Sequence, residues 1–103
     1  MKIHALVLGF GVASSAYTSL LDFIKVETPV LGRPVDKKKI NSCKKTRKEK
    51  GFNLKYSKKI QFFNAEELQK IDLGTVNFII VGTNTKGIDW AINILNKLKI
   101  DCP

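Results

Sequence analysis

The amino-acid sequence predicts an α/β domain in which helices cover both faces of a parallel sheet, so that the molecule has three layers. Short apolar runs at residues 3–8, 28–31 and 76–81 have the length and composition of buried strands. Segments with helical periodicity separate them, and strands that alternate with helices form βαβ units with parallel strands. With 103 residues, of which 44% are apolar and 26% charged, the chain is expected to fold as a single domain.

The first predicted unit consists of a strand, a helix and a second strand. Residues 3–8 form a short, mostly apolar run that Gly9 terminates, as expected of a strand buried on both faces. Apolar residues then recur every three or four positions, which predicts a helix; they are Ala13, Ala16, Tyr17, Leu20, Leu21 and Ile24. The second strand is expected at Thr28–Leu31, where Pro29 lacks an amide donor. That strand should therefore begin at the proline or have a shortened ladder.

The middle of the chain is more polar. Gly32-Arg33-Pro34 interrupts the pattern, and Asp36 is expected to cap a mostly solvated helix that runs to about Lys50, before Gly51 stops it. Residues 52–63 then alternate between apolar and polar side chains, which indicates two short strands or a hairpin.

The last third of the chain predicts one more strand and one more helix. A short helix or turn is expected at residues 65–71, followed by the strand at 76–81. Thr85 is expected to cap the final helix. The apolar face of that helix carries Ile88, Ala91, Ile92, Leu95 and Leu98.

A glycine-rich turn joins the first strand to the first helix. Gly9 suits the tight bend, Gly11 lets the backbone approach a phosphate, and Ser14 is the small third residue that packs the helix against a strand. The amides of Val12 to Ser14 would face the anion, and the helix dipole would favour its charge. The context predicts the pyrophosphate turn of a Rossmann-type dinucleotide-binding domain. The alternative is a tight turn that binds no ligand.

The end of the second strand distinguishes the two nicotinamide dinucleotides. A carboxylate there accepts the ribose hydroxyls of NAD, whereas an arginine accommodates the 2′-phosphate of NADP. Gly32-Arg33 occupies this position in the chain. Arg33, with Lys37 or Lys38 as further cations, therefore predicts NADP(H) as the cofactor. The alternative is an arginine that is merely solvated.

Three segments together resemble the N-terminal domain of ketopantoate reductases. They are Lys2-Ile3 through Gly9-Phe10-Gly11, Val30-Leu31-Gly32-Arg33, and the strand Asn77-Phe78-Ile79-Ile80-Val81 that leads into a helix. The resemblance covers most of the chain. It implies that residues 1–103 are the cofactor-binding domain of an enzyme that uses NADPH to reduce 2-dehydropantoate, a small-molecule substrate, to pantoate.

The resemblance also implies roles for individual residues. Gly9, Phe10, Gly11, Val12 and Ala13 would hold the pyrophosphate, Arg33 the 2′-phosphate, and Gly82, Thr83 and Asn84 would border the ribose and nicotinamide. The family commonly has a lysine just after the fourth strand, where this chain reads Gly82-Thr83-Asn84-Thr85 and Lys86 is the available substitute. The family's acid–base lysine lies beyond the first hundred residues, so we expect cofactor binding without turnover.

Positive charge dominates the surface. The chain has 18 basic and 9 acidic residues, a net charge of +9, which favours an anionic partner. Eight of the basic residues lie between positions 36 and 50. Such a helix either tracks a nucleic-acid backbone or is a solvated face beside the adenosine pocket; with only Asn41 and Thr46 for base contacts, nucleic acid is the weaker interpretation.

Alternative functions remain open from the sequence. The chain suits a non-catalytic nucleotide-binding or nucleic-acid-binding Rossmann module, or the cofactor domain of a glycerol-phosphate or opine-type dehydrogenase. A single histidine, His4, and the isolated Cys43 and Cys102 form no metal site. We expect a cytoplasmic protein with two free thiols and no membrane partner, for which a homodimer is possible.

Overall fold

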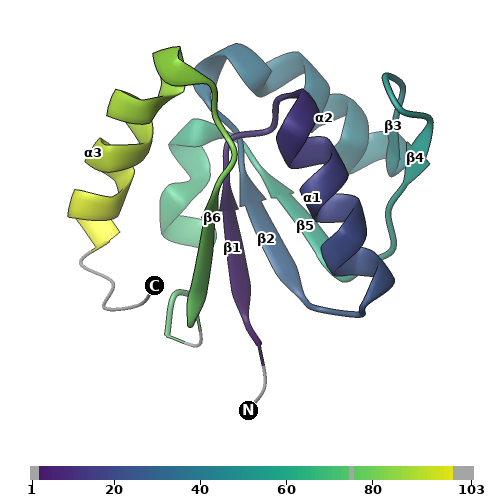
Figure 1. Cartoon of the computed structure of the whole chain (residues 1–103), viewed down its shortest axis with the longest axis horizontal. Helices are drawn as coiled ribbons and strands as arrows, with labels where there is room; N and C mark the ends of the chain where they lie inside the picture. Colours follow the sequence, from purple (N-terminus) through teal and green to yellow (C-terminus); the bar gives the residue numbers. More distant parts are fainter. Residues whose placement is uncertain (1–2, 75, 99–103) are drawn as a thin grey trace.

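A computed structural model describes residues 3–74 and 76–98. Its centre is a parallel four-stranded sheet with the order β5-β2-β1-β6 (Figure 1). The strands are β1 (Ala5–Leu8), β2 (Thr28–Leu31), β5 (Ile60–Phe63) and β6 (Phe78–Val81). The helices are α1 (Val12–Phe23), α2 (Lys37–Thr46) and α3 (Ile88–Leu98), with the 3₁₀ helices η1 (Pro34–Asp36), η2 (Ala65–Lys70) and η3 (Thr85–Gly87). The predicted Rossmann-like α/β fold is confirmed.

Two apolar cores lie on the two faces of the sheet. Helices α1 and α2 cover one face, and α3 with the segment around η2 covers the other. Strand β1 contributes to both cores, since successive side chains of a strand point to opposite faces. Ala5 and Val7 pack under α1, whereas Leu6 and Leu8 pack under α3. This arrangement is the predicted three-layer structure.

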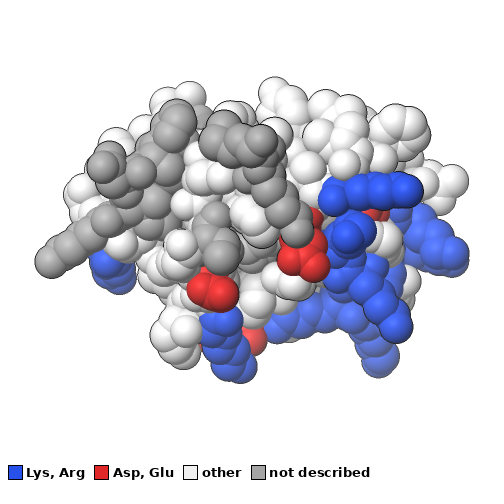
Figure 2. Space-filling view, turned by 90° about the horizontal axis from the view of Figure 1, so that it is seen from below, with Lys and Arg blue, Asp and Glu red and all other residues white. Residues whose placement is uncertain are grey.

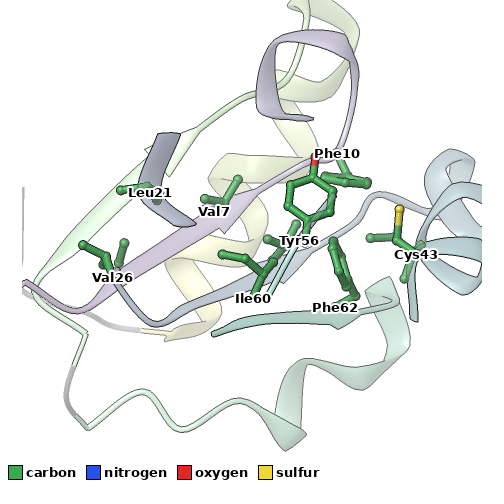
Figure 3. Packing of buried hydrophobic residues seen from close by; sticks show 11 residues of the cluster. Val7, Phe10, Leu21, Val26, Cys43, Tyr56, Ile60 and Phe62 are labelled. Atoms are coloured by element: carbon green, nitrogen blue, oxygen red, sulfur yellow. The ribbon is translucent and has the colours of Figure 1, made fainter. Parts of the chain in front are cut away.

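An aromatic cluster fills the core under α1 and α2. Phe10 and Phe62 meet edge to face with 5.3 Å between ring centroids, and Tyr56 lies 5.4 Å from Phe62 (Figure 3). The Tyr56 hydroxyl donates a hydrogen bond of 2.9 Å to the carbonyl of Ser15, in the first turns of α1. Burial raises the pKa of Tyr56, so this hydroxyl stays protonated and keeps its donor role. The cluster thus supports the start of α1 from below.

Strand β2 matches its predicted bounds and shows the effect of its proline. All four of its residues pair with β5, but only Val30 and Leu31 pair with β1. Pro29 has no amide hydrogen to donate, so the ladder to β1 begins at the next residue. The expectation of a shortened ladder is confirmed.

Helix α1 forms where predicted but buries a different face. The residues packed onto the sheet are Ser14, Ser15, Thr18 and Leu21. Leu20 is 60% exposed, and Tyr17 and Ile24 are also exposed, so most of the apolar stripe lies at the surface. Small side chains occupy the inner face because the glycine turn brings the helix close to the strands.

The predicted helix from residue 36 to Lys50 is too long. Helix α2 ends at Thr46, where Arg47 takes the left-handed conformation with φ 62° and its amide closes the helix onto Cys43. The Arg47 guanidinium donates to the carbonyl oxygens of Ser57 and Ile60, which holds this end of the helix against β5. Tertiary contacts therefore end the helix before the glycine does.

The segment from residue 48 to 63 also differs in detail from the prediction. β3 (Lys48–Glu49) pairs with β4 (Leu54–Lys55) in a small antiparallel hairpin, whereas β5 joins the main sheet. The 3₁₀ helix at residues 65–70 confirms the expected short helix. Thr85 does not cap α3. It is instead the first residue of η3, which precedes that helix, and Asn84 is the N-cap residue of η3.

The carboxyl ends of β1, β2 and β6 lie at one edge of the sheet, at the top of Figure 1. Helix α1 begins at the same edge, with the loops after β2 and β6 beside it. In open α/β sheets, ligands bind at this edge. None of the helices in the described ranges is long and apolar enough to cross a lipid bilayer.

Candidate functional site

A cavity of about 300 Å³ opens at the carboxyl edge of the sheet. Three loops line it: the glycine turn after β1, the segment after β2, and the segment after β6. Its lining residues are Gly9, Phe10, Gly11, Val12, Ala13, Arg33, Asp36, Gly82, Thr83 and Asn84. Of the residues that the sequence proposed for cofactor binding, the lining lacks the two alternative cations, Lys37 and Lys38, and Ser14, whose side chain is buried.

Gly9 and Gly11 play different structural roles in the turn. Gly9 has φ +95°, and a Cβ there would lie 2.5 Å from Cγ2 of Thr83 and 3.3 Å from the carbonyl oxygen of Gly82. Only glycine fits that conformation and that space. A Cβ on Gly11, by contrast, would meet no protein atom within 4 Å. Gly11 is therefore not needed for packing, and it leaves the cavity side of the turn open to an approaching group.

Helix α1 directs its positive end toward the cavity. The backbone amides of its first turn, which includes Val12 and Ala13, have no acceptor within the helix. No acidic side chain lies in that turn to neutralise it. The amide of Ser15 is the first to bond back, at 3.0 Å to the carbonyl of Gly11. The turn thus has the geometry of an anion-binding site, and no side chain of the turn itself supplies a negative charge to the amides of Val12 and Ala13.

Ser14, the third position of the glycine pattern, packs directly on the loop after β6. It is fully buried, and its Oγ donates a hydrogen bond of 2.8 Å to the carbonyl oxygen of Gly82. A Cβ on Gly82 would lie 1.7 Å from that Oγ. The glycine that permits helix α1 to pack closely against the sheet is therefore Gly82, directly after β6, and not a residue of the turn.

Arg33 borders the cavity from the loop after β2. Its Nη1 lies 3.4 Å from Oδ1 of Asn84, so a weak contact bridges the β2 and β6 loops. Gly87 lies under the guanidinium, since a Cβ there would be 3.0 Å from Nε of Arg33. The side chain is half-buried and keeps donors toward the cavity. In the described part of the chain, the neighbouring Thr83 hydroxyl is buried without a partner.

Asp36 is the lining residue that sequence reasoning missed. It was predicted only as a helix cap, but its Oδ2 accepts hydrogen bonds from two amides, that of nearby Arg33 at 2.9 Å and that of distant Phe10 at 3.0 Å. The three-residue spacing from Arg33 to Asp36 is a capping-box signal that predicts the first bond. No sequence signal predicts the second, which joins residues 26 positions apart.

The lysines of α2 do not form one solvated face. Lys37 lies outside the cavity lining, and its Nζ is 3.7 Å from a carboxylate oxygen of Glu66. Lys44 pairs with Glu67. Lys39 is half-buried, with its Nζ 4.6 Å from the centroid of the Phe10 ring. The other four lysines of α2 are exposed, so the helix is mostly solvated, as expected, and Lys39 is the exception.

Other basic side chains gather at the opposite end of the molecule. Seen from below, lysine and arginine side chains concentrate on one side of the surface (Figure 2). One depression of the surface is bordered by Lys25, Lys55 and Lys59, which come from three different parts of the chain. Positive charge is thus spread over several elements and is not confined to α2.

The remaining sequence candidates lie outside the cavity lining. His4 precedes β1 and its amide donates to Oδ1 of Asn77 at 3.0 Å, while Trp90 packs on the core under α3. Lys86 is exposed in η3. Cys43 is a buried free thiol, and Cys102 lies outside the described residues. Within the described ranges, no group of His, Cys, Asp and Glu side chains is arranged to hold a metal ion.

Comparison with known proteins adds no assignment to this geometry. No protein-family model matches the chain, and no curated protein matches it. The chemistry of the cavity is therefore the basis for a functional conclusion. That chemistry combines free helix amides, an open glycine and one arginine at a single edge of the sheet.

Proposed function

We propose that this chain binds NADP(H) at the carboxyl edge of its sheet. The observation that carries the proposal is that the glycine turn and Arg33 line the same cavity. The turn offers amides and a helix dipole to a pyrophosphate, and the arginine offers a planar pair of donors to a second phosphate. Two anion-binding features that follow neighbouring strands, β1 and β2, and line one cavity suit a dinucleotide that carries an additional 2′-phosphate.

The residues present fit this cofactor in two respects. The open side of Gly11 leaves room for a phosphate to approach the backbone, and no acidic side chain occupies the first turn of α1. The one carboxylate in the lining, Asp36, is bonded to two backbone amides. Asp36 also lies at the end of η1, three residues beyond Arg33, so the charged residue closest to the end of β2 is the arginine and not a ribose-binding acid, which would favour NAD.

The proposed role is cofactor binding for hydride transfer. The nicotinamide ring of a bound NADPH supplies a hydride, and the protein supplies orientation. Arg33 and Asp36 are the ionisable side chains among the described residues that line the cavity, and both contact its loops. The resemblance to ketopantoate reductases supports an oxidoreductase that acts on a 2-oxo acid.

The test is to titrate the protein with NADPH and, separately, with NADH, and to measure binding by nucleotide fluorescence or calorimetry. We expect NADPH to bind more tightly than NADH, and Arg33→Ala to weaken NADPH binding by roughly tenfold or more while changing NADH binding little. Lys37→Ala is the matched control, because it removes the same charge from outside the cavity. Equal affinities for both nucleotides in wild type and Arg33→Ala would contradict the NADP assignment.

A further inference from the structure

Asp36 connects the two loops that the proposed function assigns to the two phosphates. Its Oδ2 accepts one hydrogen bond from the amide of Phe10, inside the glycine turn, and one from the amide of Arg33. The two distances are 3.0 Å and 2.9 Å, normal for strong bonds of this kind. A single carboxylate thus fixes the position of the turn relative to the arginine loop.

Lys39, one helical turn further along, holds the same glycine turn from its other side. Its Nζ donates to the carbonyl oxygen of Gly11 at 3.3 Å and to Oγ of Ser15 at 2.5 Å. The ammonium also lies over the Phe10 ring, which is fully buried. The beginning of α2 therefore contacts an amide on one side of the turn and a carbonyl on the other.

This arrangement divides the amides of the turn between structure and ligand. Gly9 donates its amide to the carbonyl of Leu31 at 2.7 Å, and Phe10 donates to Asp36. Both amides are committed to the fold. In the described residues, the amides of the turn that donate to no protein acceptor are those of Gly11, Val12, Ala13 and Ser14, and these remain for an anion. A phosphate bound by these amides would lie at Gly11 and the first turn of α1, directly after the amide of Phe10 that Asp36 holds.

We propose that Asp36 is a positioning residue that sets the spacing between the pyrophosphate site and Arg33, and so contributes to the preference for the 2′-phosphorylated dinucleotide. The inference rests on the proposed function, since it concerns the same cavity. Asp36 acts through the backbone of Phe10 and Arg33 and not through contact with the reacting atoms. Loss of its carboxylate frees both loops at once.

The experiment compares Asp36→Ala and Asp36→Asn in the full chain. We expect Asp36→Ala to weaken NADPH binding by about tenfold or more, and NADH binding less, because the arginine contact is lost only for NADPH. Asp36→Asn keeps an oxygen that accepts both amides and should restore most of the NADPH affinity. In an Arg33→Ala background, Asp36→Ala should cost less than in wild type, since the two residues act together.

Asp22 supplies the matched control. Its carboxylate accepts a 2.7 Å hydrogen bond from the amide of Ser57 and also contacts the Ser57 hydroxyl, outside the cavity lining. Asp22→Ala should lower stability but leave the ratio of NADPH to NADH affinity unchanged. A merely structural role of Asp36 would give this same result, with both nucleotides weakened equally and no coupling to Arg33.

Amide hydrogen exchange gives a readout without nucleotide. Asp36→Ala should speed exchange at Phe10 and Arg33 and leave strand β5 protected, which also shows that the variant folds. Unchanged exchange at these amides, or an unchanged NADPH-to-NADH ratio, overturns the inference while leaving the proposed function intact. Absence of binding of either nucleotide to the wild-type chain overturns the proposed function and this inference with it.

Discussion

The contact between Ser14 and Gly82 shows how one atom can set the distance between a helix and a strand. Oγ of Ser14 is 2.8 Å from the carbonyl oxygen of Gly82 and occupies the space where a Cβ on that residue would lie. The hydroxyl both fills the gap and satisfies the carbonyl. The glycine and the serine are therefore complementary, and each restricts the other.

This complementarity predicts a non-additive pair of substitutions. Gly82→Ala should lower the free energy of unfolding by about 1–3 kcal/mol, because its methyl group would overlap Oγ of Ser14. Ser14→Gly removes the overlap, so the double variant should be more stable than the sum of the two single effects. Urea denaturation of all four proteins measures the coupling. Strict additivity would show that the two residues do not restrict each other.

At the scale of elements, α1 illustrates how an apolar pattern can predict a helix and misplace its buried face. The stripe that defines the periodicity is mostly exposed, while Ser14, Ser15 and Thr18 are fully buried. Periodicity is a property of one segment, so the helix was predictable. The buried face depends on how closely the helix approaches the sheet, and Gly82, directly after β6, makes room for that approach.

Adjacent leucines test this orientation. Leu21→Ala should destabilise the fold by roughly 2–4 kcal/mol, because Leu21 is 8% exposed and packs in the core under α1. Leu20→Ala makes the same chemical change at a side chain that is 60% exposed, and its effect should stay within about 0.5 kcal/mol. Thermal or urea unfolding measures both. A larger loss at Leu20 than at Leu21 would reverse the orientation described for α1.

The C-terminal end of α2 could not be predicted from local sequence either, because contacts with distant residues determine it. Lysine-rich sequence continues past Thr46 without a breaker until Gly51, so propensity alone extends the helix. Arg47 instead adopts a left-handed conformation, while its guanidinium binds carbonyl oxygens ten and thirteen residues away. Glu49 then leaves solvent and caps the amides of Gly51 and Phe52 in the hairpin. Long-range contacts decide the boundary.

At the scale of the whole molecule, Glu67 joins the two outer layers. It belongs to η2, on the α3 side of the sheet, and it pairs with Lys44 of α2 on the other side. The Lys44 contact, a 2.9 Å hydrogen bond from the Asn64 amide and a 3.2 Å contact with Lys70 lower the pKa of Glu67 to about 2. The ionised carboxylate is thus favoured in the folded protein.

This pKa predicts a pH-dependent contribution to stability. Because the folded value lies below the ordinary value of 4.5, the contribution is complete above that pH and is lost as the pH falls toward 2. The stability difference between wild type and Glu67→Gln should therefore shrink across this range in urea denaturation. Glu66→Gln is the control, since that carboxylate is exposed and 3.7 Å from Lys37. A difference independent of pH would contradict the assignment.

Local patterns predicted most of the fold and most of the candidate site. Strand burial and glycine spacing are properties of short segments, so the parallel sheet and the three loops at its carboxyl edge followed from them. Asp36 and Lys39 could not be assigned in this way. Each is polar in a polar segment, and its partners, Phe10 and Gly11, are brought to it only by the completed fold.

The position of the packing glycine has a consequence for how such turns are recognised. In this molecule the space between α1 and β6 is created by Gly82, 68 residues after the serine at the third position of the turn. A search pattern confined to the turn would score Ser14 as a defect. A pattern that allows the small residue either in the helix or directly after the neighbouring strand would match this chain. It would also find other turns in which the third glycine lies after that strand.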